Sequence, residues 1–255
     1  MDRQQRRARG HAVREDLGLA GQITEGGLPG FNDFIAEVTF AGIWDRPGLS
    51  RQERFLCTLA VLSLHQRPQL EAMIASALDH GVAPREVLEV FIQAGLYGGF
   101  VTAETSIAVA RSVFSAQGVV VPDEPSRDDT DARLDELGQE VMHTLHGERA
   151  TGGYAAPDNP VTGALYGSAI RYGYGELWGR PGLTHQQRML VAIASFTALK
   201  LESQVAKFGQ SALNIGLSKE QVIEAVVQTA PYSGFPPALN ALGILSSTWE
   251  TSART

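Results

Sequence analysis

Side chains able to bind or polarise an oxygen atom occur in this sequence in pairs. Gln69 and Gln204 are amides that follow long apolar runs, and Tyr97 and Tyr232 stand in Y-x-G-F turns. An amide can hydrogen-bond a carbonyl or enolate oxygen, or it can make a structural contact at a surface or an interface. A phenol can donate to an oxygen that gains negative charge, or it can anchor an aromatic core. These four residues are the first candidates for catalysis.

Four arginines form a second set of candidates. Arg46 and Arg180 stand in R-P-G-L turns, where an arginine either binds a carboxylate in bidentate fashion or holds the turn together; we favour the turn. Arg54 and Arg188 begin apolar helices, and a buried charge needs a partner. That partner is either a structural carboxylate or an anionic ligand.

Three further groups were weighed for chemistry. His65 ends an apolar run and is either a general base in one pocket or a helix-end histidine. Cys57 lies within an apolar helix, which predicts a buried, inert thiol. Glu140 and His143 have the spacing found in di-iron helix bundles. Such a site needs a second Glu-x-x-His motif, which the sequence lacks, so we predict no metal and no cofactor.

These candidates occur in pairs because the sequence contains two copies of one module. The run WDRPGLSRQER at 44–54 returns as WGRPGLTHQQR at 178–188, and QAGLYGGF at 93–100 returns as QTAPYSGF at 228–235. The repeat is too long for a solenoid, whose units span roughly 20–50 residues. It predicts two compact tandem domains.

The elements that carry the candidates are predicted to be helices. Ser50 and Glu53 have capping-box spacing, as do Thr184 and Gln187, and apolar runs follow at 55–64 and 189–199. Strand-like alternation is not sustained anywhere. We therefore predict an all-α fold. Its predicted parts are a first module at 1–116, a linker rich in Pro, Asp and Ser at 117–130, and a second module at 131–255.

Composition excludes several classes of protein. The net charge is −7 and the basic residues are scattered, so we predict no nucleic-acid partner. No run reaches the roughly 18 apolar residues that a membrane span needs, and a single cysteine excludes an intrachain disulfide. We expect a cytoplasmic protein. The arginines near the N-terminus are interleaved with acids, which indicates a solvated helix start rather than an anion-binding arm: Arg3, Arg6, Arg7, Arg9 and Arg14.

Several of these motifs together resemble the carboxymuconolactone decarboxylase family. They are the W-x-R-P-G-L element, the arginines at 54 and 188, the A-L-x-x-G helix ends at 77–81 and 212–216, and the run at 228–241. The resemblance implies helical subunits in a ring-like hexamer and cofactor-free decarboxylation of a lactone acid. With two modules per chain, three chains would complete the ring, so we expect a homotrimer.

The sequence departs from that family at the positions that carry its chemistry. A related peroxidase branch uses a C-x-x-C pair, which one cysteine cannot supply. The decarboxylases typically have a histidine where this chain has Met73 and Phe208, and a glutamate where it has Phe55 and Met189. Both copies have lost both groups, and a histidine and a carboxylate are the usual pair for proton transfer near neutral pH.

Two functions remain open from the sequence. The first is a cofactor-independent enzyme that decarboxylates, isomerises or rearranges a small cyclic substrate, derived from an aromatic compound or polyketide-like. The second is a non-catalytic ligand-binding or assembly protein that keeps the fold. In either case, the substrate-binding residues would be the arginines at 54 and 188 with Trp44, Trp178, Met73, Phe208, Phe100 and Phe235.

Overall fold

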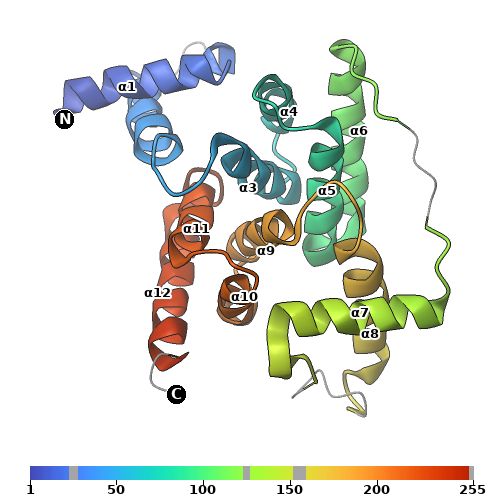
Figure 1. Cartoon of the computed structure of the whole chain (residues 1–255). Helices are drawn as coiled ribbons and strands as arrows, with labels where there is room; N and C mark the ends of the chain where they lie inside the picture. The colour runs from blue at the N-terminus through green and yellow to red at the C-terminus, as the bar shows by residue number, and fades with distance from the viewer. Residues whose placement is uncertain (23–27, 123–126, 152–158, 253–255) are drawn as a thin grey trace.

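The computed structural model describes residues 1–22, 28–122, 127–151 and 159–252, and all the regular structure in these ranges is helical. The first half contains α1 (Arg3–Asp16), η1 (Ala20–Gln22), α2 (Phe31–Ile35), η2 (Ala36–Trp44), α3 (Arg51–Leu64), α4 (Leu70–Asp79), α5 (Pro84–Gly98) and α6 (Phe100–Ala116). The second half repeats this order with α7 (Asp131–His146), η3 (Gly147–Thr151), α8 (Gly163–Ser168), η5 (Ala169–Trp178), α9 (His185–Leu199), α10 (Glu202–Asn214), α11 (Lys219–Ser233) and α12 (Phe235–Ser252). The all-α prediction is confirmed (Figure 1).

The helices begin where the capping motifs predicted. The Ser50 hydroxyl accepts from the Glu53 backbone N–H at 3.2 Å, while the Glu53 carboxylate accepts from the Ser50 backbone N–H at 2.7 Å. Thr184 and Gln187 make the same reciprocal pair at the start of α9. These caps satisfy amide groups that a helix start leaves without partners.

Each module has its own apolar core, and each core includes residues from the central helix of the other module. Helices α3 and α9 lie side by side in the centre of the molecule (Figure 1). Val191 of α9 belongs to the apolar cluster of the first module, and Cys57 and Val61 of α3 belong to that of the second. The two tandem modules therefore pack closely against each other, because each central helix contributes to the core of the other module.

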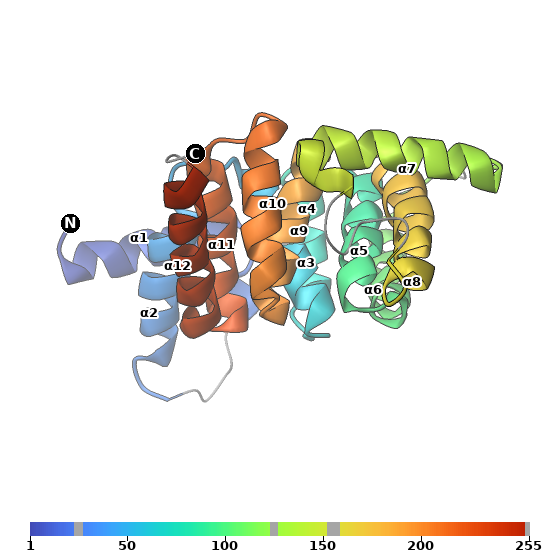
Figure 2. The same ribbon diagram turned by 90° about the horizontal axis from the view of Figure 1, so that it is seen from below.

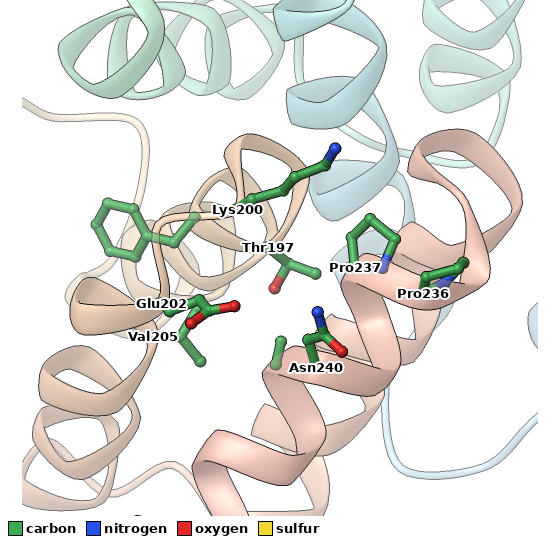
Figure 3. Close-up of a pocket in the computed structure, with 9 residues that line it drawn as sticks. Thr197, Lys200, Glu202, Val205, Pro236, Pro237 and Asn240 are labelled. Carbon is green, nitrogen blue, oxygen red and sulfur yellow. The ribbon is translucent and has the colours of Figure 1, made fainter.

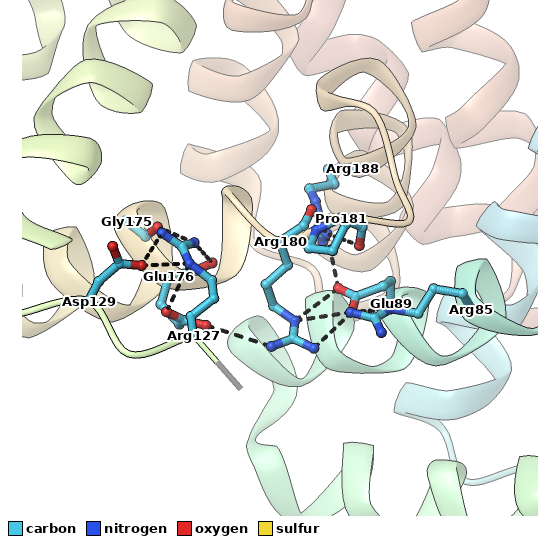
Figure 4. Close-up of polar contacts among 9 residues, drawn as sticks. All are labelled: Arg85, Glu89, Arg127, Asp129, Gly175, Glu176, Arg180, Pro181 and Arg188. Carbon is cyan, nitrogen blue, oxygen red and sulfur yellow. Dashed lines mark hydrogen bonds and ion pairs between the residues drawn. The ribbon is translucent and has the colours of Figure 1, made fainter. Parts of the chain in front are cut away.

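Two buried glutamates form ion pairs between the modules, each with two arginines of the other module. Glu224 of α11 binds Arg46 at 2.6 Å and Arg54 at 2.9 Å, both in the first module. Glu89 of α5 binds Arg180 at 3.0 Å and Arg188 at 2.9 Å in the second (Figure 4). The side chains of Glu224 and Glu89 are 4% and 0% exposed, so these charges are compensated inside the protein.

The N-terminal helix of each module crosses a wide helical segment at a glycine. A Cβ on Gly10 would meet the carbonyl of Ala36, and a Cβ on Gly138 would meet that of Ile170. Helices α1 and α7 can therefore lie directly on η2 and η5. In Figure 2, α7 runs across the layer that contains α5 and α8.

Candidate active site

Two pockets of similar size occupy equivalent places in the two halves. The first has a volume of about 460 Å³ and is lined by Phe40, Gln69, Met73 and Tyr232. The second has a volume of about 430 Å³ and is lined by Tyr174, Gln204, Phe208 and Tyr97. Volumes of a few hundred Å³ suit a small-molecule ligand.

Each pocket is built from both modules of one chain. The first takes Gln69 and Met73 from its own module and Tyr232 from the other. The second takes Gln204 and Phe208 from its own module and Tyr97 from the other. The structure thus brings together the amides, the phenols and the residues at 73 and 208 that the sequence singled out.

A tryptophan holds each of these phenols. Trp44 Nε1 donates to the Tyr232 hydroxyl oxygen at 2.7 Å, and Trp178 makes the corresponding bond to Tyr97. Gln93 Nε2 also donates to the Tyr97 oxygen, at 2.7 Å. Burial raises the pKa of Tyr232 to about 12 and that of Tyr97 further, against the lowering effect of these bonds. Both phenols stay protonated at neutral pH and can act as hydrogen-bond donors.

One wall of each pocket is a π-helix. The Asp45 N–H bonds to the Phe40 carbonyl five residues back, and η5 has the same wide winding as η2. The π-helix places Phe40 in the first pocket and Tyr174 in the second. π-Helical segments are rare and often occur at functional sites.

The first pocket contains cationic groups. Arg14 is 6% exposed and lines this pocket with Arg67. Its Nε donates to the Leu19 carbonyl at 3.1 Å and its guanidinium lies 5.4 Å from the centre of the Phe40 ring. Its Nη1 is buried with no hydrogen-bond partner among the described residues. Burial lowers the pKa of Arg14, so this is a desolvated cation in a pocket wall.

The described residues that line the second pocket have apolar or uncharged polar side chains. Trp178, Phe196 and Phe208 pack at one side, with ring centroids of Phe196 and Phe208 4.8 Å apart. Tyr174 stacks on Trp178 with 6.2 Å between ring centroids. Its hydroxyl also lies 3.0 Å from Nε2 of the buried His146.

Several predicted site residues lie elsewhere. Arg54 and Arg188 have internal carboxylate partners, so the expectation that they bind substrate is replaced by a structural role between the modules. His65 packs at a helix end with Nε2 3.2 Å from Ser233 Oγ and does not line either pocket. Phe100 and Phe235 are 59% and 47% exposed at the starts of α6 and α12, outside both pockets.

The sequence reasoning missed Arg14, Tyr174 and His146. Arg14 was read as part of a solvated helix start, but its neighbours in the folded helix are the apolar Val13 and Leu17. An arginine on the apolar face of an amphipathic helix was the signal available. No sequence pattern indicated the contact of His146 with Tyr174.

A third pocket is smaller and mixed in charge. It has a volume of about 170 Å³ and lies between α9, α10 and α12, where Glu202 points toward Asn240 and Lys200 extends away from it (Figure 3). Phe196 separates it from the second pocket, because this residue lines both. The volume is below the roughly 300 Å³ at which ligand sites usually begin.

Other groups weighed from the sequence lie apart from both pockets. Cys57 is fully buried, and burial raises the pKa of its thiol to about 12. Glu140 and His143 are exposed on α7. Within the described ranges, no cluster of three or more His, Cys, Asp or Glu side chains could hold a metal ion. No described helix is both long enough and apolar enough to cross a membrane.

The fold and pockets define a duplicated, all-helical protein with two pockets that are each lined by residues of both modules. The chain belongs to the carboxymuconolactone decarboxylase family, whose model matches residues 29–112 and 164–247. The family resemblance seen in the repeated motifs is thereby confirmed, once for each module.

Two relatives are decarboxylases. The chain is 30% identical over 99 residues to 4-carboxymuconolactone decarboxylase of Acinetobacter baylyi, a match that covers 38% of this chain and 73% of that protein. It is 24% identical over 123 residues to nitrosuccinic acid decarboxylase of Metarhizium robertsii, covering 48% of this chain and 86% of that protein. The chain is therefore a tandem member of a decarboxylase-like enzyme family.

Proposed function

We propose that this protein is a cofactor-independent decarboxylase of a small organic acid and that the first pocket is its active site. The observation that carries the proposal is the guanidinium of Arg14, which is 6% exposed in the pocket wall and has no carboxylate partner among the described residues. An uncompensated buried cation is costly, so a pocket that keeps one is suited to an anion. Both relatives named above are decarboxylases of acids by their names.

The pocket residues divide the work of such a reaction. The C–C bond to the carboxylate breaks, CO₂ leaves, and the electron pair moves onto an acceptor oxygen of the substrate. We place that oxygen against Arg14, with Gln69 and Tyr232 as further donors, because donors fixed where charge develops give the largest stabilisation. A proton from water then replaces CO₂ on carbon.

Apolar groups would assist the departure of CO₂. Met73, Ile35 and Phe40 line the same pocket as Arg14. A carboxylate held against such side chains loses hydration, which favours its conversion to neutral CO₂. This mechanism replaces the histidine and glutamate that both modules lack with a cation, a phenol and desolvation.

Assembly and compartment are part of the same proposal. Because one chain contains two family modules, we propose that three chains complete a ring of six modules. The protein would then be a homotrimer in the cytoplasm. A small molecule is then the ligand, with neither nucleic acid nor membrane as a partner.

The test is CO₂ release from two acids, 4-carboxymuconolactone and nitrosuccinate. The wild type is expected to release CO₂ from at least one, and Arg14→Met to lose most of that activity while remaining folded by circular dichroism. Methionine is the matched replacement, because the equivalent position of the second module is Met142. Tight binding of an acid without CO₂ release would favour the non-catalytic alternative. If the protein neither binds these acids nor releases CO₂ from them, the proposal is overturned.

A further inference from the structure

The two pockets are equivalent in position but opposite in polarity. When the glycine crossings at Gly10 and Gly138 are aligned, Arg14 of α1 corresponds to Met142 of α7. A cation beside the first pocket is thus a thioether in the second module. The change removes the group on which acid binding in the first pocket would depend.

A second cation is also replaced. Gln66 and Lys200 share the left-handed conformation that ends α3 and α9, with φ of 49° and 59°. The next residues, Arg67 and Leu201, each bond back five positions, to the carbonyls of Leu62 and Phe196. Arg67 therefore corresponds to Leu201. By the same alignment, Gln66 corresponds to Lys200 and His65 to Leu199.

A hydrogen-bonded series of three side chains, Tyr174, His146 and Ser211, begins at the wall of the second pocket. The Ser211 hydroxyl donates to the Lys207 carbonyl at 3.0 Å, so its oxygen accepts from Arg149 Nη2 at 3.0 Å and from His146 Nδ1 at 2.7 Å. Nδ1 of His146 must then carry the proton, and Nε2 is the acceptor for the Tyr174 hydroxyl at 3.0 Å.

His146 is held neutral by its surroundings. It is 8% exposed and packs edge-on against Phe208, with 5.0 Å between ring centroids. Burial, with smaller contributions from Arg149 and Lys207, lowers the pKa of His146 to about 4. Because Tyr174 gives its proton to this neutral imidazole, its oxygen acts as an acceptor toward other groups. His146 is a positioning residue that sets this polarity.

Tyr97 has the opposite polarity across the same pocket. Its oxygen accepts from Gln93 and from Trp178, so its own proton is available to an acceptor. The second pocket thus offers one acceptor and one donor, and none of its described lining residues is charged. An anion placed there would lose hydration without gaining a cation.

We propose that the second pocket is a separate binding site for an uncharged, ring-sized molecule that carries a hydroxyl group, such as a phenol or a stable enol, which donates to Tyr174. A carbonyl or ether oxygen elsewhere on the same ligand accepts from Tyr97. This site is independent of the acid decarboxylation proposed for the first pocket. The chain then binds two chemically different ligands at pseudo-equivalent positions.

Calorimetric titration of the full chain at pH 7 with three probes tests the proposal. The probe 4-hydroxyacetophenone carries both a hydroxyl and a carbonyl and is expected to bind. Acetophenone lacks the hydroxyl and is expected to bind about tenfold more weakly, since one hydrogen bond is worth roughly 1–1.5 kcal/mol. The anion 4-hydroxybenzoate is expected not to compete for the site.

Variants locate the binding and distinguish it from the first pocket. Tyr174→Phe, which installs the residue of the equivalent position Phe40, should weaken 4-hydroxyacetophenone about tenfold and leave acetophenone unchanged. Arg14→Met should leave both affinities unchanged. Gly173→Leu, which fills the space beside Leu96, should abolish binding. Should that variant fail to fold, the Tyr174→Phe comparison still decides.

Three results would overturn the proposal. They are no binding of 4-hydroxyacetophenone, equal loss of both neutral probes in Tyr174→Phe, and weakened binding in Arg14→Met. The first two would show that Tyr174 does not recognise the hydroxyl. The last would place the probe in the first pocket.

Discussion

Trp44 donates its indole N–H to the hydroxyl oxygen of Tyr232 at 2.7 Å across 188 positions of sequence. The tryptophan belongs to the first copy of the repeat and the tyrosine to the second. The bond places a phenol of one module in the pocket wall of the other. Neither module alone would contain a complete pocket.

This arrangement predicts that each tyrosine serves the pocket of the opposite module. Tyr232→Phe should reduce CO₂ release in the first pocket about 100- to 1,000-fold, in line with the loss of one donor to a developing charge. Tyr97→Phe is the matched control and should leave that activity within about twofold, because it lines the second pocket. Equal losses in the two variants would contradict the assignment. Steady-state kinetics of the two purified variants provides the comparison.

Glu224 should be essential for stability. Glu224→Gln leaves Arg54, which is 1% exposed, without its charged partner. We expect the free energy of unfolding in urea to fall by about 3–5 kcal/mol, because an uncompensated buried charge remains. The control is Glu136→Gln on the surface, where a 67% exposed carboxylate pairs with Arg133, and about 1 kcal/mol or less is expected. Similar losses for both variants would mean that the ion pairs of Glu224 do not stabilise the fold more than a surface ion pair does.

Protein stability should fall as the solution becomes acidic. The pKa of His146 is near 6.5 in an unfolded chain and about 4 in the fold, so the unfolded state binds the extra proton first. Folding stability should therefore decrease from about pH 6.5 down to about pH 4, by up to about 1.4 kcal/mol per pH unit from this group. The charges of Arg149 and Lys207 also oppose the protonation of His146.

Two histidine variants separate this effect from general acid denaturation. His146→Gln should flatten the slope of unfolding free energy between pH 6.5 and 4. His143→Gln, exposed on the same helix, should keep the wild-type slope. Urea titrations at a series of pH values give these slopes, and identical slopes for the two variants would refute the role of His146.

The glycine crossing of α7 and η5 should not tolerate a methyl group. Gly138→Ala is expected to lower the free energy of unfolding by about 1–3 kcal/mol, since the new Cβ would meet the Ile170 carbonyl. Gly243→Ala in α12 meets nothing within 4 Å and should stabilise by up to about 1 kcal/mol through helix propensity. Thermal unfolding of both variants measures the contrast. A stabilised Gly138→Ala would show that the helices do not approach this closely.

The proposed assembly has a direct mass test. Light scattering should give about three times the chain mass of 27.4 kDa. The exposed Phe100 and Phe235, at equivalent helix starts, are candidates for the surfaces between chains. Replacing both with serine should lower the measured mass while circular dichroism stays unchanged. A 27.4 kDa species in the wild type would exclude the trimer.

The sequence by itself determined the helices and their repetition. The capping boxes at Ser50 and Thr184 and the apolar runs behind them are local signals, and local hydrogen bonds and side-chain periodicity are sufficient to specify a helix. The repeated turns identified the family. The sequence also showed that the expected histidine and glutamate are replaced in both modules. The residues Gln69, Tyr232 and their counterparts were likewise found by pairing the two copies.

The tertiary structure decided which residues meet, because contacts between modules have no local signature. In the sequence, Arg54 and Arg188 were compatible with a ligand or with a structural carboxylate, and α11 and α5 bring Glu224 and Glu89 to them. Arg14 became a pocket residue only when α1 crossed η2 at a glycine. The opposite polarity of the two pockets follows from such packing, in which single side chains on duplicated helices meet different neighbours.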